Sequence, residues 1–157
     1  AYVNLAIIYN EQCKFEDAIH SFETAAKLET KEKGFSPQLK AKLANTYASL
    51  GDTYTELGDY KKARDEYERA VDISPSYLDI KLKLAKTNIN LHDFKRAEEV
   101  LRDILKRNPN YMEAKINLGL CLYKRNKLEE AKAIWENILK RDPENSKAKA
   151  YLNMLKH

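Results

Sequence analysis

A 34-residue period marked by proline and alanine constrains the fold of this chain more than any other feature. Three similar phrases, AVDISP, ILKRNP and ILKRDP, end at successive prolines that lie 34 residues apart, and an alanine precedes each proline at a constant distance. Self-similarity at a fixed period of this length is the signature of a repeat architecture. The markers are Pro75, Pro109 and Pro143, preceded by Ala63, Ala97 and Ala131.

Each repeat contains two stretches with helical periodicity. Tyr60, Ala63 and Tyr67 are spaced so that a large, a small and a large side chain share one stripe of a helix. Gly58 precedes this stripe in a short polar turn and can adopt the positive φ that ends a helix. The repeat is therefore predicted to be helix, tight turn, helix. An earlier stripe consists of Tyr47, Leu50, Gly51 and Tyr54.

The segment Ala44 to Pro75 resembles a nearly complete tetratricopeptide repeat, with Tyr47 where the family usually has Trp. The copies Leu78 to Tyr111 and Met112 to Asn145 follow in exact register. The resemblance implies an all-α fold, a right-handed α-solenoid of stacked helix-turn-helix repeats with a carboxyl-terminal capping helix. The matching residues are Leu50, Gly51, Tyr54, Ala63, Tyr67, Ala70 and Pro75, then Leu84, Ala85, Ala97 and Pro109, then Leu118, Gly119, Ala131, Trp135 and Pro143, whereas Lys81, Asn88 and Ile104 depart from the pattern.

Eleven residues interrupt the period between Ala18 and Ala63. Within them, Ser36 and Pro37 are typical of a helix start after a stop at Gly34. We therefore expect a helix from 37 to about 57 that is some two turns longer than its counterparts. A single array is expected over 1–157, divided into a truncated repeat (1–32), an insertion or helix extension (33–43), repeats at 44–77, 78–111 and 112–145, and a capping helix (146–157).

The two ends of the chain differ in character. The chain begins at Ala1, in the middle of the repeat pattern, so we expect it to be a piece of a longer protein. Its first helix has no polar cap, which predicts that upstream repeats or a partner cover Val3 and Ile7. Residues 146–156 instead carry an apolar stripe on one side and Lys149, Asn153 and Lys156 on the other, as expected of a helix that ends the array.

The sequence holds no pattern that carries catalysis or a cofactor. We find no Gly-rich phosphate loop, no His-Glu-x-x-His and no Cys-x-x-Cys. Cys13 and Cys121 match no metal spacing and are interpreted as small, partly buried residues. We therefore expect no enzyme, no cofactor and no metal site.

Charge and hydropathy narrow the classes of partner. A net charge of +4 and a pI near 8.9 are only mildly basic, so nucleic acid is not expected. No apolar run reaches the roughly 18 residues of a membrane span, and the default localisation is the cytoplasm.

Charge is unevenly distributed along the sequence. Residues 95–157 carry a net charge of +6 and residues 1–94 a net charge of −2. This difference could steer an acidic partner to the carboxyl-terminal half, or it could simply reflect a solvated helix surface.

In the tetratricopeptide family, the first helices of successive repeats line a concave face that holds peptides. Helical geometry assigns specific positions of each first helix to that face. Apolar residues there, rimmed by lysine and asparagine, could hold an amphipathic helix or an extended peptide, or the array could bury them. The predicted site residues are Val3, Ile7, Asn45, Asp52, Leu82, Lys83, Lys86, Ile89, Ile116, Asn117, Leu120 and Tyr123, centred on the third and fourth repeats.

Chaperone-binding members of the family clamp an acidic carboxyl-terminal tail with side chains on the opening helices of three successive repeats: Lys and Asn in the first repeat, Asn in the second, and Lys and Arg in the third. The corresponding positions here are Val3 and Ile7, then Ser49, then Asp79 and Lys83. We therefore do not expect that clamp in this chain.

Three hypotheses for function remain. The first is an interaction scaffold that binds a protein or peptide, acidic or amphipathic, on the concave face. The second is a structural arm of a larger multi-repeat protein that packs on its own repeats or self-associates through its uncapped first helix. The third is an arm that recruits substrate to an enzyme elsewhere in the same chain.

Overall fold

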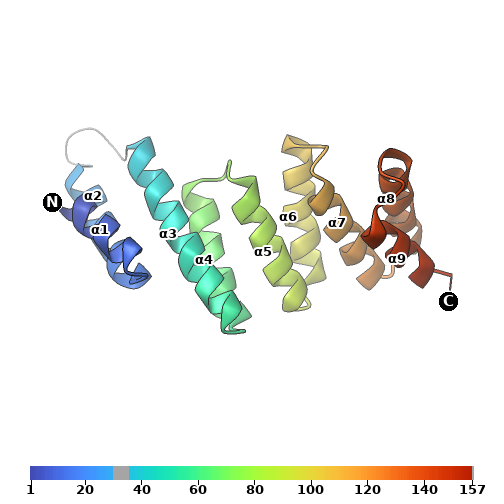
Figure 1. Ribbon diagram of the computed structural model, residues 1–157, viewed down its shortest axis with the longest axis horizontal. Helices are drawn as coiled ribbons and strands as arrows, with labels where there is room; N and C mark the ends of the chain where they lie inside the picture. The colour runs from blue at the N-terminus through green and yellow to red at the C-terminus, as the bar shows by residue number, and fades with distance from the viewer. Residues whose placement is uncertain (30–35, 157) are drawn as a thin grey trace. The chain divides into compact units, whose positions relative to one another are not determined.

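The structure is a computed structural model that describes residues 1–29 and 36–156, and these residues form helices without strands (Figure 1). An all-α fold of stacked helical repeats, the α-solenoid class, is confirmed. The helices are α1 (Tyr2–Glu11), α2 (Phe15–Glu29), α3 (Pro37–Glu56), α4 (Tyr60–Ile73), α5 (Leu78–Asn90), α6 (Phe94–Arg107), α7 (Met112–Lys124), α8 (Leu128–Arg141) and α9 (Ser146–Met154). No helix in the described ranges is both long enough and apolar enough to cross a membrane.

The chain divides into two compact units, Ala1–Ile80 and Lys81–His157, and the boundary falls within α5. In the amino-terminal unit, α1 packs on α2, α3 packs on α4, and α2 also packs on α3. In the carboxyl-terminal unit, α6 packs on α7, α7 on α8, and α8 on α9. Each unit is therefore a stack of helix pairs in which the second helix of one pair contacts the first helix of the next.

The alanines that mark the period lie at the closest helix contacts. Ala63, Ala97 and Ala131 are fully buried, as is Ala18 in the first pair. A methyl group at these positions lets a neighbouring backbone approach closely, and the large side chains of the same stripe fill the space beside it. Those large side chains are also buried: Tyr67, Leu101 and Trp135 are at most 2% exposed.

The turn between the two helices of each pair contains one residue in the left-handed region. Gly58 has φ 76°, as the sequence predicts, and Cys13, His92 and Asn126 have φ 57°, 58° and 61° at the equivalent turns. Cys13 is exposed, so its interpretation as partly buried is wrong, because the turn holds its side chain outside the helix contact.

Helix α3 begins where the sequence predicts. The Oγ of Ser36 accepts a hydrogen bond from the N–H of Leu39 at 3.2 Å, and Pro37 is the first helical residue. The helix has 20 residues against 13 in each of α5 and α7, which corresponds to about two extra turns. The predicted extension is confirmed, whereas the predicted stop at Gly34 lies outside the described residues.

Helix α9 packs against α8 with its apolar side. Ala148 is fully buried, and the ring of Tyr151 stacks on Trp135 with centroids 5.0 Å apart. Lys149, Asn153 and Lys156 are exposed, as the sequence predicts for a helix with a solvated outer side.

Candidate functional site

The structure places the twelve predicted site residues on the first helices of the four pairs. Because the two units are separate bodies, we consider the residues of each unit by themselves. The amino-terminal unit holds Val3 and Ile7 on α1 and Asn45 and Asp52 on α3, and the other eight lie in the carboxyl-terminal unit on α5 and α7.

In the amino-terminal unit, residues of α1, α2 and α3 line an open pocket of about 430 Å³. Two predicted residues, Ile7 and Asn45, are brought together in its lining. Val3, although on α1, is not among the lining residues, and neither is Asp52. The complete lining is Ile7, Asn10, Glu11, Phe15, Phe22, Lys42, Asn45 and Ser49.

The floor of the pocket is apolar and its rim is polar. Phe22 is 1% exposed, and Ile7 and Phe15 are half-buried, so a ligand entering the pocket meets an apolar surface. Glu11, Lys42 and Asn45 are exposed at the rim. An apolar interior with a few polar groups at its edge is the usual composition of a site for a peptide side chain.

Asn10 links the pocket to the core of the unit. Its Nδ2 donates a hydrogen bond to Oγ1 of Thr46 at 2.9 Å, and the Thr46 hydroxyl donates in turn to the carbonyl of Lys42 at 2.9 Å. The Oδ1 of Asn10 is buried and accepts no hydrogen bond from the described part of the chain. The hydrogen bond to Thr46 therefore fixes the side chain of Asn10 between α1 and α3, with its amide oxygen closed off from solvent.

Asp52 serves packing in this unit. Its Oδ1 accepts a hydrogen bond from the hydroxyl of Tyr67 at 2.6 Å, which ties α3 to α4. Burial, and next the hydrogen bond to Asp52, raises the pKa of Tyr67 above its usual value, so this hydroxyl stays a donor at neutral pH.

In the carboxyl-terminal unit, two of the five predicted apolar site residues are buried, as in the alternative in which the array covers them. Leu82 is 5% exposed and Ile116 7%. Ala48 at the equivalent position of α3 is 6% exposed, so the fifth position of each first helix belongs to the packed interior of the repeat. Ile89, Leu120 and Tyr123 are half-buried.

Polar side chains of α5 and α7 contact one another. Lys86 forms an ion pair with Glu113, and both side chains remain partly exposed. The amide Nδ2 of Asn117 donates to the backbone carbonyl of Glu113 at 2.8 Å, within α7. Lys83, also on α5, is half-buried. Lys86 therefore connects α5 to α7, and Asn117 bonds to the backbone of its own helix.

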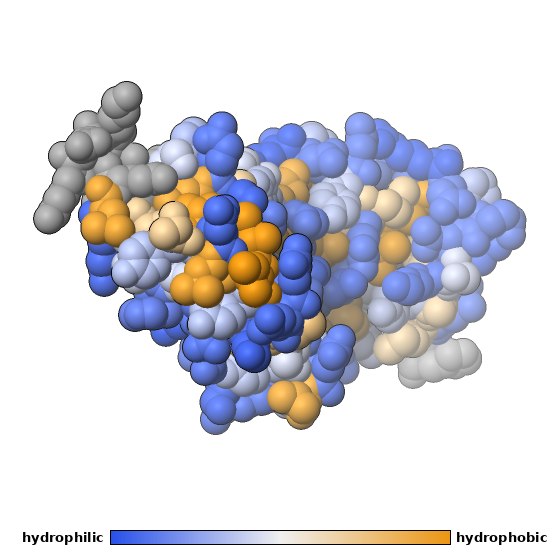
Figure 2. Space-filling view, turned by 60° about the vertical axis from the view of Figure 1, so that its left-hand side comes forward, coloured by the Kyte–Doolittle hydropathy of each residue, from blue (hydrophilic) through white to orange (hydrophobic). Residues whose placement is uncertain are grey.

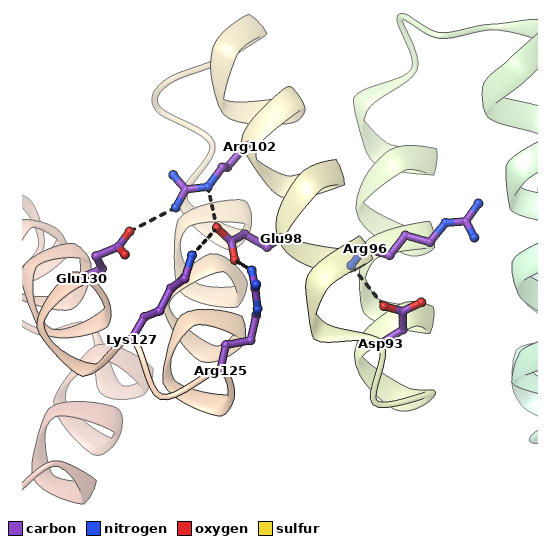
Figure 3. Close-up of polar contacts among 7 residues, drawn as sticks. All are labelled: Asp93, Arg96, Glu98, Arg102, Arg125, Lys127 and Glu130. Atoms are coloured by element: carbon purple, nitrogen blue, oxygen red, sulfur yellow. Dashed lines mark hydrogen bonds and ion pairs between the residues drawn. The ribbon is translucent and has the colours of Figure 1, made fainter.

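The densest charge cluster of the unit lies elsewhere and surrounds Glu98 on α6 (Figure 3). Glu98 is 6% exposed and accepts hydrogen bonds from Arg102 at 2.9 Å, from Lys127 at 3.4 Å and from Arg125. Burial alone would raise the pKa of this carboxyl, but the bonds from the three cations outweigh burial, and the pKa lies below its usual value. The cluster holds α6 to the turn between α7 and α8.

Comparison with known proteins identifies the class of repeat. The model of the cytochrome c-type biogenesis protein H TPR domain matches residues 38–149, well over half of the chain. The chain belongs to the tetratricopeptide repeat (TPR) family. No curated protein sequence matches this TPR chain significantly.

Several solved TPR structures resemble this one. The first TPR of Spaghetti (RPAP3) bound to the HSP90 peptide SRMEEVD is 27% identical, with a TM-score of 0.69 over 74% of this chain and 92% of that chain. YrrB, a TPR protein with an unusual peptide-binding site, is 24% identical, with a TM-score of 0.67 over 94% and 70%. The Arabidopsis OM64 TPR domain is 18% identical, with a TM-score of 0.70 over 74% and 97%. The last two likenesses concern the fold alone.

The pocket lining contains residues that sequence reasoning did not include. Phe15 and Phe22 have the spacing of the second-helix signature, which predicts core positions and not the lining of a pocket. Lys42 lies in the extension of α3, which has no counterpart in the other repeats. The interruption of the 34-residue period is the sequence feature that could have indicated Lys42. An insertion next to the first helix of a repeat lengthens that helix and adds side chains to its surface.

Proposed function

We propose that this chain is a protein-interaction module that binds a peptide in the pocket between α1, α2 and α3. The observation that carries the proposal is the pocket itself, an open depression of about 430 Å³ with an apolar floor and a polar rim. Compared with the hypothesis from sequence, the centre of binding moves from the third and fourth repeats to the first helices of the amino-terminal unit.

The position of the pocket within the family supports this proposal. Ile7 and Ser49 stand at two positions where chaperone-binding TPR proteins carry clamp asparagines, and both line the pocket. The similar TPR of Spaghetti (RPAP3) is solved with an HSP90 peptide. A half-buried isoleucine and a serine replace the two amides here, so we propose that this chain binds an apolar side chain where its relatives bind a terminal carboxylate.

Filling the pocket tests the proposal. Asn45 is exposed at the rim, so Asn45→Phe places a ring over the opening without disturbing the core. Peptides selected from a phage-displayed library of random 11-residue sequences against the wild-type chain should lose at least ten-fold in affinity for this variant, measured by fluorescence anisotropy. Asn90→Phe, an equal change at an exposed position of α5, is the control. Selected peptides that bind both variants like the wild type would place the site elsewhere, and failure to select any peptide would also count against the proposal.

The exposed side of α1 favours a second candidate function, self-association. Tyr2, Leu5 and Ile8 are 44%, 39% and 47% exposed, whereas Tyr47 and Leu50, which are equivalent to Tyr2 and Leu5, are 6% and 9% exposed on α3, beneath α2. Figure 2 shows apolar side chains gathered at this end of the molecule. An uncovered apolar helix face of this kind is a candidate contact surface for a second copy of the chain.

A further inference from the structure

The extension of α3 is a packed part of the pocket wall. Its residues 37–43 have no counterpart in α5 or α7, which begin at positions equivalent to Ala44. Leu39 and Leu43 are 3% and 4% exposed, so the extra turns are anchored in the interior of the unit. Lys42 lies next to this buried stripe, and its side chain lines the pocket. The extension therefore adds a cation at a defined place on the rim.

The two opposite walls of the pocket carry opposite charges. Glu11 comes from α1 and Lys42 from α3, and both are exposed. Neither of them forms a salt bridge with a residue that the structure describes. Between them lie the apolar floor and the buried Oδ1 of Asn10, which has no donor within the described residues.

From this arrangement we infer that the pocket is specific for an internal peptide segment in which an apolar residue is flanked by an acidic residue. The apolar side chain contacts Ile7, Phe15 and Phe22, and the acidic side chain pairs with Lys42. Glu11 on the opposite wall favours a basic residue on the other flank. A segment inside a chain fits this pattern better than a chain end, because charges are required on both sides of the anchor. The inference rests on the proposed function and specifies the ligand of the same site.

The contribution of Lys42 to affinity is modest in size and clear in sign. A partly exposed ion pair is worth about 0.2–1 kcal/mol, and replacing attraction by repulsion doubles this difference. Since 1.4 kcal/mol corresponds to a factor of ten, Lys42→Glu should weaken binding of an acidic peptide by about 2- to 30-fold. The same variant should bind the corresponding basic peptide better than the wild type does.

The matched control is Lys40→Glu. It makes the same charge change two residues away on the same extension, at an exposed position that does not line the pocket. Wild type, Lys42→Glu and Lys40→Glu are each used to select from a library with the pattern X5-Φ-X5, where Φ is Leu, Phe or Tyr. We expect the wild type and Lys40→Glu to enrich Asp and Glu at one fixed distance from Φ, and Lys42→Glu to enrich Lys and Arg at that distance.

Three outcomes would overturn the inference: no enrichment of acidic residues, enrichment that Lys42→Glu leaves unchanged, or an equal effect of Lys40→Glu. Peptides that lose affinity only when their free carboxyl terminus is amidated would also overturn it, because Lys42 would then bind a chain end. Selected peptides that remain sensitive to Asn45→Phe in any of these cases leave the proposed function standing. Peptides insensitive to Asn45→Phe contradict the proposed function itself.

Discussion

At the scale of single residues, Asn88 on α5 is the least favourable side chain in the interior. It is 0% exposed, and neither its Nδ2 nor its Oδ1 has a hydrogen-bond partner among the described residues. A buried amide without partners costs about 1–3 kcal/mol. Leu122 occupies the equivalent position of the next repeat and is also fully buried, so an aliphatic side chain suits this place. We predict that Asn88→Leu raises the free energy of unfolding by about 1–3 kcal/mol, measured by urea denaturation.

The control for this prediction is Asn90→Leu, which makes the same change at an exposed position two residues later. It should leave stability within about 0.5 kcal/mol of the wild type. A fall in stability for Asn88→Leu would mean that the amide is satisfied, for example by an ordered water, and that the repeat tolerates it for that reason.

Glu98 gives the carboxyl-terminal unit a defined response to acid. Its pKa is lower in the folded chain than in the unfolded chain, so its ionised form stabilises the fold above the unfolded pKa of about 4.3. This contribution is lost as pH falls through the lower folded pKa. We predict that Glu98→Gln costs about 1–3 kcal/mol at pH 7 and less at pH 3, measured by urea denaturation at both values.

Glu130→Gln is the control for Glu98. Glu130 also bonds to Arg102, at 3.2 Å, but it is exposed, so its loss should be within about 0.5 kcal/mol. Equal effects of the two variants at pH 7, or a cost of Glu98→Gln that does not shrink at pH 3, would show that the buried carboxylate is not the stabilising member of the cluster.

At the scale of helices, small and large residues are matched across each pair. A Cβ on Gly51 would lie 2.7 Å from Cε1 of Tyr67, and one on Gly119 would overlap the indole of Trp135. In the intervening repeat the equivalent residues are Ala85 and Leu101, both fully buried, so a methyl group is accommodated where the opposing side chain is smaller. The size of the residue on the first helix is thus set by the ring on the second.

This matching predicts the effect of Gly119→Ala. The methyl group must displace the buried ring of Trp135, at a cost of about 1–3 kcal/mol despite the better helix propensity of alanine. In a Trp135→Leu background the same change should cost less than half as much, since the clash is removed. Thermal denaturation of the four chains of this double-mutant cycle provides the measurement. Equal costs in both backgrounds would refute the matching.

Much of the arrangement of helices could be predicted from the sequence, because the period and the start signal at Ser36 and Pro37 depend on local chemistry. The extension of α3 was predictable for the same reason. The pocket was not, since its lining joins side chains from three helices whose approach depends on packing. The burial of Leu82 and Ile116 could not be decided from the sequence, because helical periodicity alone does not show how far neighbouring helices cover the fifth position.

At the scale of the whole molecule, two properties could drive association between copies. The amino-terminal 94 residues carry a net charge of −2 and the remaining 63 a net charge of +6, so the first segment of one copy attracts the second segment of another at low salt. The exposed side of α1 instead offers an uncharged apolar surface, with Glu11 as the only charged residue of that helix. The two causes differ in their response to salt, because screening weakens charge attraction and leaves apolar contact largely intact.

We predict a weak dimer that forms through α1 and persists in 0.5 M NaCl. Burying the exposed parts of Tyr2, Leu5 and Ile8 on two copies contributes a few kcal/mol above the cost of association, which corresponds to a dissociation constant of roughly 10 μM to 1 mM. Sedimentation velocity over this concentration range should show the dimer for the wild type and a monomer for Ile8→Glu. The control is Leu57→Glu, which introduces the same charge outside α1, at a residue that is 74% exposed. If the dimer dissociates in 0.5 M NaCl, association is due to charge. If Leu57→Glu disrupts the dimer as strongly as Ile8→Glu, another surface is involved. In either case α1 is not the contact between copies.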